Sequence, residues 1–130
     1  MLSNRIIGGY KVEKVNLKEK MNLIKKHWSP KIAGELNDSH IKLAKIKGEF
    51  IWHHHDHEDE LFFVVKGKLV IRLKNQDIHL EEGEFLIIPK GVEHLPVAEE
   101  EVEIMMIEPK TTVNTGNVNN DKTVEELDWI

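Results

Sequence analysis

A run of titratable side chains stands inside an apolar part of the chain and restricts what this region can form. Residues 53–60 carry four histidines and four carboxylates in eight consecutive positions, with apolar residues on both sides at 50–51 and 61–65. A segment flanked by this much apolar surface must satisfy its polar groups with a partner, water or a metal. His53 and His55 would share one face of a strand. Imidazole is a common ligand of zinc, copper, iron and nickel, and carboxylates extend the set to manganese.

The size and charge of the chain exclude several classes of protein. Its 130 residues, 40% of them hydrophobic, suit one domain with one core. The 18 Lys and Arg residues against 23 Asp and Glu give a net charge of −5 without a basic block, which argues against nucleic acid as a partner. The chain has no cysteine, so disulfides and thiolate metal sites are excluded and any metal must be held mainly by nitrogen and oxygen. No apolar run is long enough to span a membrane, and residues 1–10 lack the apolar core of a signal peptide, so we expect a cytoplasmic protein.

Local patterns divide the chain into an N-terminal arm with a helix (residues 1–30), a strand-rich centre (31–110) and a polar tail (111–130). In the arm, Asn16 and Glu19 resemble the two ends of a capping box. Apolar residues follow at roughly helical spacing as far as Trp28, and a proline comes soon after. This pattern predicts an amphipathic helix over residues 17–27.

The centre of the chain shows short runs of strand-forming residues separated by closely spaced turns. Strands are predicted over residues 32–36, 40–47, 50–55, 60–66, 68–74, 85–88, 92–97 and 102–107. Three consecutive glutamates at 99–101 predict an exposed turn before the last of these strands. Many short strands indicate an all-β barrel or sandwich. In the tail, residues 117–121 are polar and predicted to be loose, and the apolar residues after them offer a way to dock the C-terminus on the body.

Two spaced motifs stand in the centre of the chain. They are Gly48-x4-His53-x-His55-x4-Glu60-x6-Gly67 and Gly83-x5-Pro89-x-Gly91-x2-His94. Together they resemble the two signature motifs of the cupin superfamily, over roughly residues 40–108. Gly48 lies one residue closer to the first histidine than the family pattern has it, and Ala98 replaces an asparagine that is not a ligand. The resemblance implies an all-β fold, a double-stranded β-helix or jelly-roll barrel, with the short N-terminal helix added to it.

The resemblance also implies a metal site with the ligands His53, His55, Glu60 and His94. One divalent transition metal per chain is expected, and iron, manganese, nickel, zinc and copper all tolerate such a set. Strand alternation agrees, because a turn at residues 56–59 would return Glu60 on the strand beside the histidine pair. Three neutral ligands and one carboxylate leave one or two positions open for water, oxygen or substrate.

Alternatives remain open within this stretch. Asp59 is the other candidate for the carboxylate ligand, since a shorter form of the motif ends there. His54 and His57 are expected at the surface or behind the ligands. A charged loop with adventitious metal affinity is a further reading, but it does not account for the spacing of the second motif. His94 alone would be read as a core histidine, whereas together with the first motif it is read as a ligand.

If the histidines face inward, alternation assigns the residues that line the pocket. They are Ile51, Phe62, Val64, Val92 and Pro96, with Met106 in preference to its neighbour Met105. Ordinary core packing is the alternative for each of them. Such walls suit a small, partly apolar or planar ligand. No Lys or Arg near the motif must point inward, although alternation allows one of Lys42, Lys45 and Lys47 near the rim.

The opposite face of the predicted strands is apolar and needs cover. It carries Trp52, Leu61, Phe63 and Val65. The N-terminal helix offers part of this cover, and a homodimer, common among small cupins, offers the rest, with intramolecular cover alone as the alternative. Residues 109–116 resemble the tail of a subgroup of small bacterial cupins. They suit a hydrogen-bonded cap over the barrel or a simple polar tail.

Three functions fit this sequence, each with a small molecule as substrate or ligand. The first is a metal-dependent enzyme, dioxygenase-like or oxidase-like before isomerase, in which the metal binds substrate or oxygen. The second is a non-catalytic, metal-dependent module that binds or senses a small ligand. The third is a structural barrel with a vestigial metal site, which the complete set of four ligands disfavours. The fold does not choose among them, and no catalytic residue beyond the metal set is identified.

Overall fold

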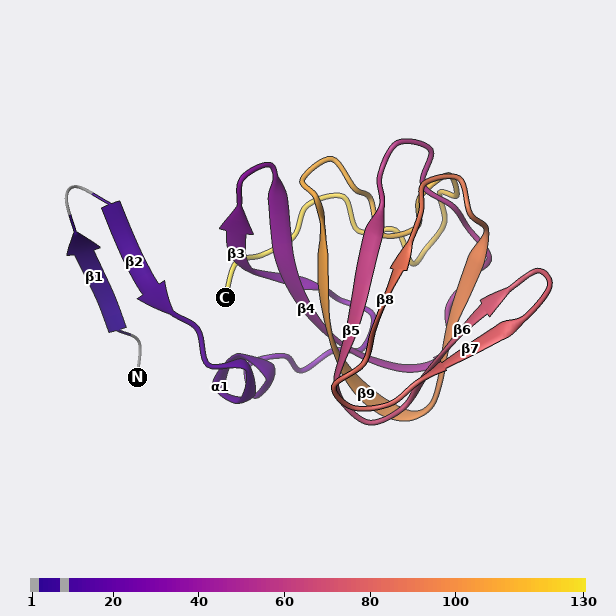
Figure 1. Cartoon of the computed structure of the whole chain (residues 1–130), viewed down its shortest axis with the longest axis horizontal. Helices are drawn as coiled ribbons and strands as arrows, with labels where there is room; N and C mark the ends of the chain where they lie inside the picture. Colours follow the sequence, from indigo (N-terminus) through magenta and orange to yellow (C-terminus); the bar gives the residue numbers. More distant parts are fainter. Residues whose placement is uncertain (1–2, 8–9) are drawn as a thin grey trace.

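Alternation of apolar and polar residues in the centre of the chain produces strands that pair antiparallel around a common core, as predicted (Figure 1). The computed structural model describes residues 3–7 and 10–130; residues 1–2 and 8–9 of the expected arm lie outside the described residues. The described elements are β1 (Ser3–Ile7), β2 (Tyr10–Lys14), α1 (Leu17–Met21), β3 (Lys31–Leu36), β4 (Ser39–Glu49), β5 (Glu60–Lys66), β6 (Leu69–Leu73), β7 (Asp77–Leu80), β8 (Phe85–Ile88) and β9 (His94–Pro109). They form an all-β barrel of the jelly-roll type with little helix.

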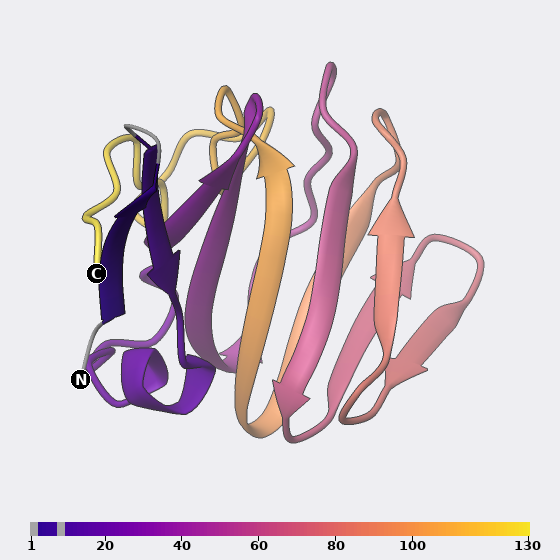
Figure 2. The ribbon, with the colours of Figure 1, turned by 60° about the vertical axis from the view of Figure 1, so that its left-hand side comes forward.

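The long strand β9 connects the two sides of the barrel. Its first residues pair with β6, from His94 opposite Leu73 onward. Its later residues pair with β4 on one side and with β5 on the other, which gives the sheet order β3-β4-β9-β5-β8 (Figure 2). The predicted turn at residues 99–101 is wrong. The strand runs through its three exposed glutamates, and it remains paired with β4 on both sides of them.

The helix is much shorter than predicted. Asn16 caps it as expected, since its Oδ1 accepts from Glu19 N at 3.0 Å, but α1 ends at Met21 instead of residue 27. Met21 and Ile24 pack on the outside of the sheet, against Leu43 of β4. Trp28 instead joins the barrel, where its indole stacks on Phe50 with 4.8 Å between ring centroids. The apolar residues whose spacing indicated one helix therefore pack at two separate sites, one outside the sheet and one in the barrel.

The main core fills the barrel with inward residues of every strand from β4 to β9. On β5, Phe62 and Val64 are buried and alternate with half-exposed neighbours, and on β9 the buried positions include Val102, Ile104 and Met106. The same alternation places two glutamate side chains inside the barrel, at one of its ends. Glu60 begins the buried face of β5, and Glu108 continues the buried face of β9.

The hairpin near the N-terminus and the last residues of the chain lie outside the barrel core. The hairpin of β1 and β2 stands beside α1 and is paired from Ser3 opposite Lys14 to Ile7 opposite Tyr10 (Figure 1). The C-terminus docks along β3, where Ile32 N donates to Asp128 O at 2.9 Å and Ile130 N donates to Ile32 O at 3.0 Å. Among the described residues, no helix has the length and apolar character needed to cross a membrane.

Candidate metal centre

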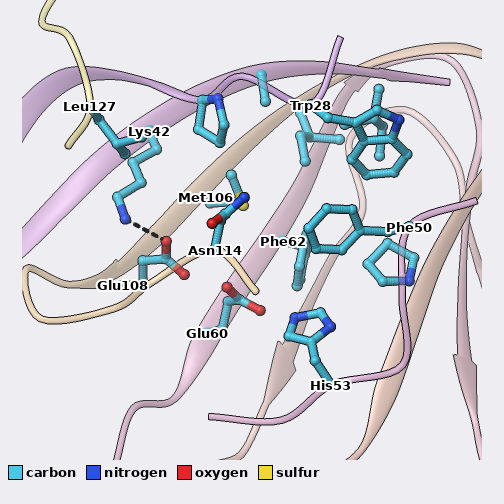
Figure 3. Close-up of a pocket in the computed structure, with 15 residues that line it drawn as sticks. Trp28, Lys42, Phe50, His53, Glu60, Phe62, Met106, Glu108, Asn114 and Leu127 are labelled. Atoms are coloured by element: carbon cyan, nitrogen blue, oxygen red, sulfur yellow. Dashed lines mark hydrogen bonds and ion pairs between the residues drawn. The ribbon is translucent and has the colours of Figure 1, made fainter. Parts of the chain in front are cut away.

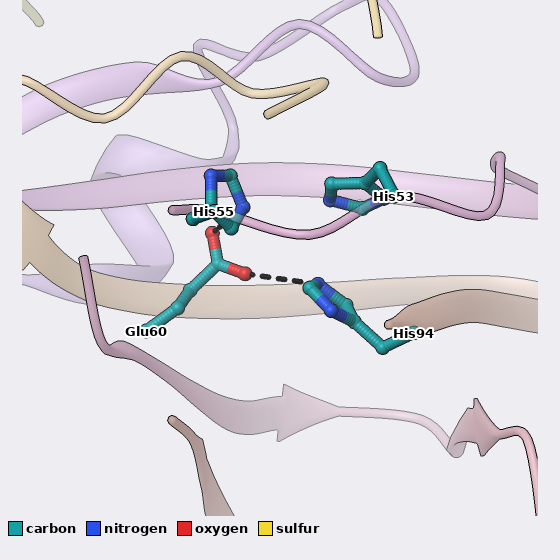
Figure 4. A group of neighbouring side chains, drawn as sticks. All are labelled: His53, His55, Glu60 and His94. Atoms are coloured by element: carbon teal, nitrogen blue, oxygen red, sulfur yellow. Dashed lines mark ion pairs between the residues drawn. The ribbon is translucent and has the colours of Figure 1, made fainter. Parts of the chain in front are cut away.

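Three histidines and one glutamate meet at one end of the barrel (Figure 4). His53 and His55 come from the irregular segment between β4 and β5, Glu60 begins β5 and His94 begins β9. One nitrogen or oxygen atom from each side chain lies within 4.8 Å of the others, and all four residues are buried. The structure thus brings together the four residues that the two motifs predict as a set.

Backbone hydrogen bonds join the two motifs directly. His53 N donates to His94 O at 3.1 Å, and His94 N donates to His53 O at 2.9 Å, so the two residues form an isolated antiparallel bridge. Gly91 N donates to His55 O at 2.7 Å. The positions of the histidine side chains therefore follow from main-chain pairing between segments that are distant in the sequence.

Two of the histidines are fixed in one tautomer. The Nδ1 atom of His53 lies 2.9 Å from Ile51 O, and Nδ1 of His94 lies 2.9 Å from Val92 O. A carbonyl oxygen can only accept, so both Nδ1 atoms carry the proton and each Nε2 is left with its lone pair. This second hydrogen bond is the usual device that orients a metal-binding histidine.

Several buried polar atoms of the cluster have no hydrogen-bond partner among the described residues. They include both ring nitrogens of His55, Nε2 of His94 and Oε1 of Glu60. The carboxylate oxygens of Glu60 lie 3.4 Å from His55 Nε2 and 3.3 Å from His94 Nε2. Leaving such atoms unsatisfied is costly. A divalent cation bound by three imidazoles and one carboxylate satisfies them, so the donor set fits a metal.

The electrostatics of the cluster favour the forms that bind a metal. Burial, together with the neighbouring His94, lowers the pKa of His53 to about 4, so this imidazole is neutral at pH 7. Burial opposes ionisation of Glu60. Interactions with the neighbouring Glu108, His55 and His94 outweigh this effect and hold the pKa of Glu60 well below its ordinary value. Neutral imidazole and ionised carboxylate are the protonation states that ligate metals.

The other titratable residues of the stretch lie outside the cluster. Asp59 is exposed and accepts from Lys90 N at 2.9 Å, which leaves Glu60 as the carboxylate in the cluster. Both ring nitrogens of His54 are 2.8 Å from carboxylates, those of Glu93 and Asp56. The hydrogen bond with Glu93 raises the pKa of His54. His57 is exposed.

A cavity with largely apolar walls opens beside the cluster and includes His53 and Glu60 in its lining (Figure 3). Of the pocket residues predicted from the sequence, Phe62, Pro96 and Met106 line it. Val64 does not, because it is fully covered within the barrel core. Ile51 does not either: residues 50–52 form no regular strand, alternation fails there, and Phe50 faces the cavity in its place.

Several cavity residues were not predicted from the sequence. Trp28 was seen only as the end of the apolar pattern of the helix, Lys42 was one of three lysines allowed near the rim, and Glu108 and Asn114 were not considered as pocket residues. Lys42 faces inward on β4 and pairs with Glu108 of β9, with 2.7 Å between Nζ and Oε1. Alternation with the buried Ala44 and Ile46 is the sequence signal that places Lys42 inside the barrel.

The tail following β9 packs against the candidate metal centre and does not extend freely. Asn117 N donates to His54 O at 3.0 Å, and His54 N donates to Asn117 Oδ1 at 2.9 Å, so the expectation that residue 117 is loose is wrong. A Cβ atom on Gly116 would lie 2.1 Å from His54 O. Asn114 lines the cavity, and its side chain is held by Lys122 O and Val124 N. The tail thus forms a hydrogen-bonded cap on the segment that carries the histidines.

Comparison with known proteins places this geometry in a family. The family model for the cupin domain matches residues 40–108. The chain is 44% identical over 61 residues to the uncharacterized protein YdbB of Bacillus subtilis, covering 46% of this chain and 54% of that protein. It is 33% identical over 96 residues to an acireductone dioxygenase of Sulfurihydrogenibium, covering 71% of this chain and 51% of the enzyme. The chain therefore spans about half the length of these curated relatives.

A solved structure shows the same fold over most of its length. A cupin-2 domain containing protein from Shewanella frigidimarina superposes with a TM-score of 0.73 at 49% identity, covering 74% of this chain and 94% of that chain. The family match, this likeness and the cluster of three histidines and one glutamate agree with the resemblance seen in the two motifs. The chain belongs to the cupin family.

Proposed function

We propose that this cupin is a metal-dependent enzyme that acts on a small molecule, of the dioxygenase or oxidase kind. The observation that carries the proposal is the position of the cluster, two of whose members, His53 and Glu60, line a cavity. A structural metal site is closed by its ligands, whereas a reactive one keeps positions open. Similarity to an acireductone dioxygenase supports the oxidative alternative over an isomerase.

The four ligands and the residues of the cavity wall have separate roles. His53, His55, Glu60 and His94 would hold the metal, and the metal would supply Lewis acidity or redox chemistry at its open positions. The cavity walls exclude water and hold an apolar or planar substrate. Trp28 and Phe50 form one stacked wall, and Phe62 also lines the cavity, with 6.3 Å between its ring centroid and that of His94.

Metal analysis and oxygen uptake test the proposal. Protein made without a histidine tag should contain about one divalent metal per chain, and the variant His53→Ala/His94→Ala should contain none. After reloading with iron or manganese, the wild-type protein should consume oxygen in the presence of some member of a panel of small enols, phenols and keto acids. The double variant should not.

Other outcomes separate the alternatives. Tight binding of a small molecule without turnover, whichever metal is loaded, would favour a non-catalytic binding or sensing module. Equal metal content in the wild type and the double variant would show that the cluster is not the metal site. Turnover without oxygen consumption would support an isomerase.

A further inference from the structure

A buried ion pair stands in the wall of a largely apolar cavity (Figure 3). Lys42 Nζ lies 2.7 Å from Glu108 Oε1, and both residues are only 3% exposed. Lys42 comes from β4, opposite Met106 of β9, so Glu108 is its diagonal neighbour across the two strands. Lys42 and Glu108 are hereafter called the polar pair.

A contribution to the stability of the fold does not by itself explain the polar pair. Removing two charges from water is expensive, and well-packed apolar residues in place of a buried ion pair often leave a protein equally or more stable. In this barrel the neighbouring inward positions of the same strands, Ala44 and Met106, are already apolar. The position of the polar pair in a cavity wall points to a role in binding.

Both members of the polar pair have unused hydrogen-bonding capacity. The Lys42 ammonium has three N–H groups, and the described residues supply it with Glu108 Oε1 and, at 3.5 Å, Thr112 O. The Oε2 atom of Glu108 is buried without a hydrogen-bond partner among the described residues. The cavity therefore has an N–H donor beside a carboxyl group, and Glu60 of the metal cluster lies in the same lining.

The chemistry of this arrangement selects one kind of ligand group. Lys42 is the only Lys or Arg among the described lining residues, and the carboxyl group of Glu108 stands beside it, so the wall offers an N–H donor next to a carboxyl group. An ammonium group would be repelled by Lys42. A hydroxyl group accepts from the ammonium and also donates or accepts at the carboxyl, so it matches the polar pair in either protonation state of Glu108.

We propose that Lys42 and Glu108 bind a hydroxyl group of the ligand, which makes the ligand a small hydroxylated molecule with an apolar or planar body. Its other end meets the cluster of His53, His55, Glu60 and His94, and its body lies against the aromatic wall of Trp28 and Phe50. This inference rests on the proposed function, because the metal cluster supplies the second anchor.

Binding of matched metal chelators tests the inference. Zinc-loaded protein is titrated calorimetrically with benzohydroxamate, which chelates zinc, and with its 2-, 3- and 4-hydroxy derivatives. At least one derivative should bind the wild-type protein about tenfold more tightly than the parent compound, the gain expected from a hydrogen bond to charged groups. In the double variant Lys42→Met/Glu108→Leu this advantage should disappear, while the parent compound keeps its affinity.

Stability and metal content serve as controls for the same variant. The double variant should keep its zinc and unfold at the same temperature as the wild type or higher, since it replaces a buried ion pair by apolar side chains. The exposed pair Lys110 and Glu35, 3.3 Å apart, gives a matched control, and Lys110→Met/Glu35→Leu should leave hydroxamate binding unchanged. If the double variant does not fold, Lys42→Met replaces it, because this single change removes the ammonium group from which the hydroxyl group accepts.

Each outcome decides a separate point. An equal affinity of the wild type for all four compounds, or a hydroxyl advantage that persists in the variant, overturns the role of the polar pair. Failure of every hydroxamate to bind a zinc-loaded protein also overturns it and leaves the metal site standing. Failure of the wild type to retain zinc overturns the proposed metal site itself.

Discussion

His53 and His94 are hydrogen-bonded to each other through both of their main chains, at 3.1 and 2.9 Å. Each also donates a ring Nδ1–H to the carbonyl two residues earlier in the chain. The orientation of their Nε2 atoms is therefore set by protein hydrogen bonds that need no metal. A cluster prepared in this way should bind a metal without a large rearrangement, so metal binding is measurable as added stability.

His55 provides a sharp test of metal binding, because neither of its ring nitrogens has a hydrogen-bond partner among the described residues. A metal that binds only the folded protein stabilises it by about 2.7 kcal/mol at a free concentration one hundred times the Kd. We expect His55→Ala to lose this metal-dependent stabilisation. Thermal unfolding with and without zinc, on protein made without a tag, measures the difference.

The matched control for this variant is His57→Ala, which changes an exposed histidine of the same stretch. It should keep the full response of the unfolding temperature to zinc. A zinc response in His55→Ala equal to that of the wild type would show that the cluster does not bind the metal.

The stability of the metal-free protein should depend on pH through His53. The pKa of this residue is about 4 in the folded protein against 6.5 for an ordinary histidine. Between these values the unfolded chain binds a proton that the folded protein does not bind. The contribution of His53 to the free energy of unfolding is therefore lost as the pH falls from 6.5 towards 4, by about 3 kcal/mol in total.

Urea unfolding of chelator-treated protein at several pH values measures this effect. Glu108 acts in the opposite direction, since burial and the nearby Glu60 raise its pKa, so the comparison must be made between variants. The difference in unfolding free energy between the wild type and His53→Asn should change across the interval from pH 6.5 to 4 and stay constant above it. A difference that is constant at all pH values would contradict the assignment.

Gly116 should be required for a correctly placed histidine segment. An added Cβ atom would overlap His54 O. The φ angle of Gly116 is +56°, a value that residues other than glycine adopt only at a cost in free energy. His54 lies between the two ligands His53 and His55 in the chain. A displaced tail that pushes on His54 therefore also moves both ligands. We expect Gly116→Ala to lower the free energy of unfolding by more than about 2 kcal/mol and to weaken zinc binding.

The variant Gly83→Ala is a control that introduces backbone strain without steric overlap of the added Cβ atom. The φ angle of Gly83 is +83°, but an added Cβ atom would meet nothing within 4 Å. This control should cost only about 1 kcal/mol and leave zinc affinity unchanged. Equal losses in the two variants, in urea unfolding and in zinc titration, would show that the contact with His54 has no particular importance.

The sequence predicted the metal cluster better than the cavity beside it, for a physical reason. The resemblance of the two spaced motifs to those of cupins implied all four ligands, and main-chain pairing of His53 with His94 brings the two motifs together. The cavity depends on pairings that no local pattern reveals. Lys42 and Glu108 are 66 residues apart and meet only because of the register between β4 and β9.

Local signals also failed where one segment serves two packing sites. The spacing that predicted a helix up to residue 27 includes Ile24, which packs outside the sheet, and Trp28, whose backbone N donates to Lys45 O at 3.0 Å on β4. Trp28 has a φ of +58°, a conformation that ends any helix and that propensity does not anticipate. Tertiary contacts therefore decide this part of the chain.

The homodimer expected from the sequence stays a prediction, and the structure indicates where to test it. Phe85 and Ile87 of β8 are 61% and 52% exposed, and they lie opposite Phe63 and Leu61 of β5. Together these side chains form an apolar outer face at one edge of the sheet, a kind of surface that often marks an interface. We propose that a second copy of the chain covers this face.

Sedimentation equilibrium measures the consequence. The double variant Phe85→Glu/Ile87→Lys should shift the protein from dimer to monomer, because charges replace apolar side chains where the copies would meet, and exposed substitutions of this kind otherwise change stability by only about 0.5 kcal/mol. Leu36→Lys is the matched control, since Leu36 is 57% exposed and lies on β3 at the opposite edge of the sheet. It should leave the dimer intact. A wild-type protein that is monomeric at high concentration, or a dimer unaffected by the double variant, would assign this face to another role.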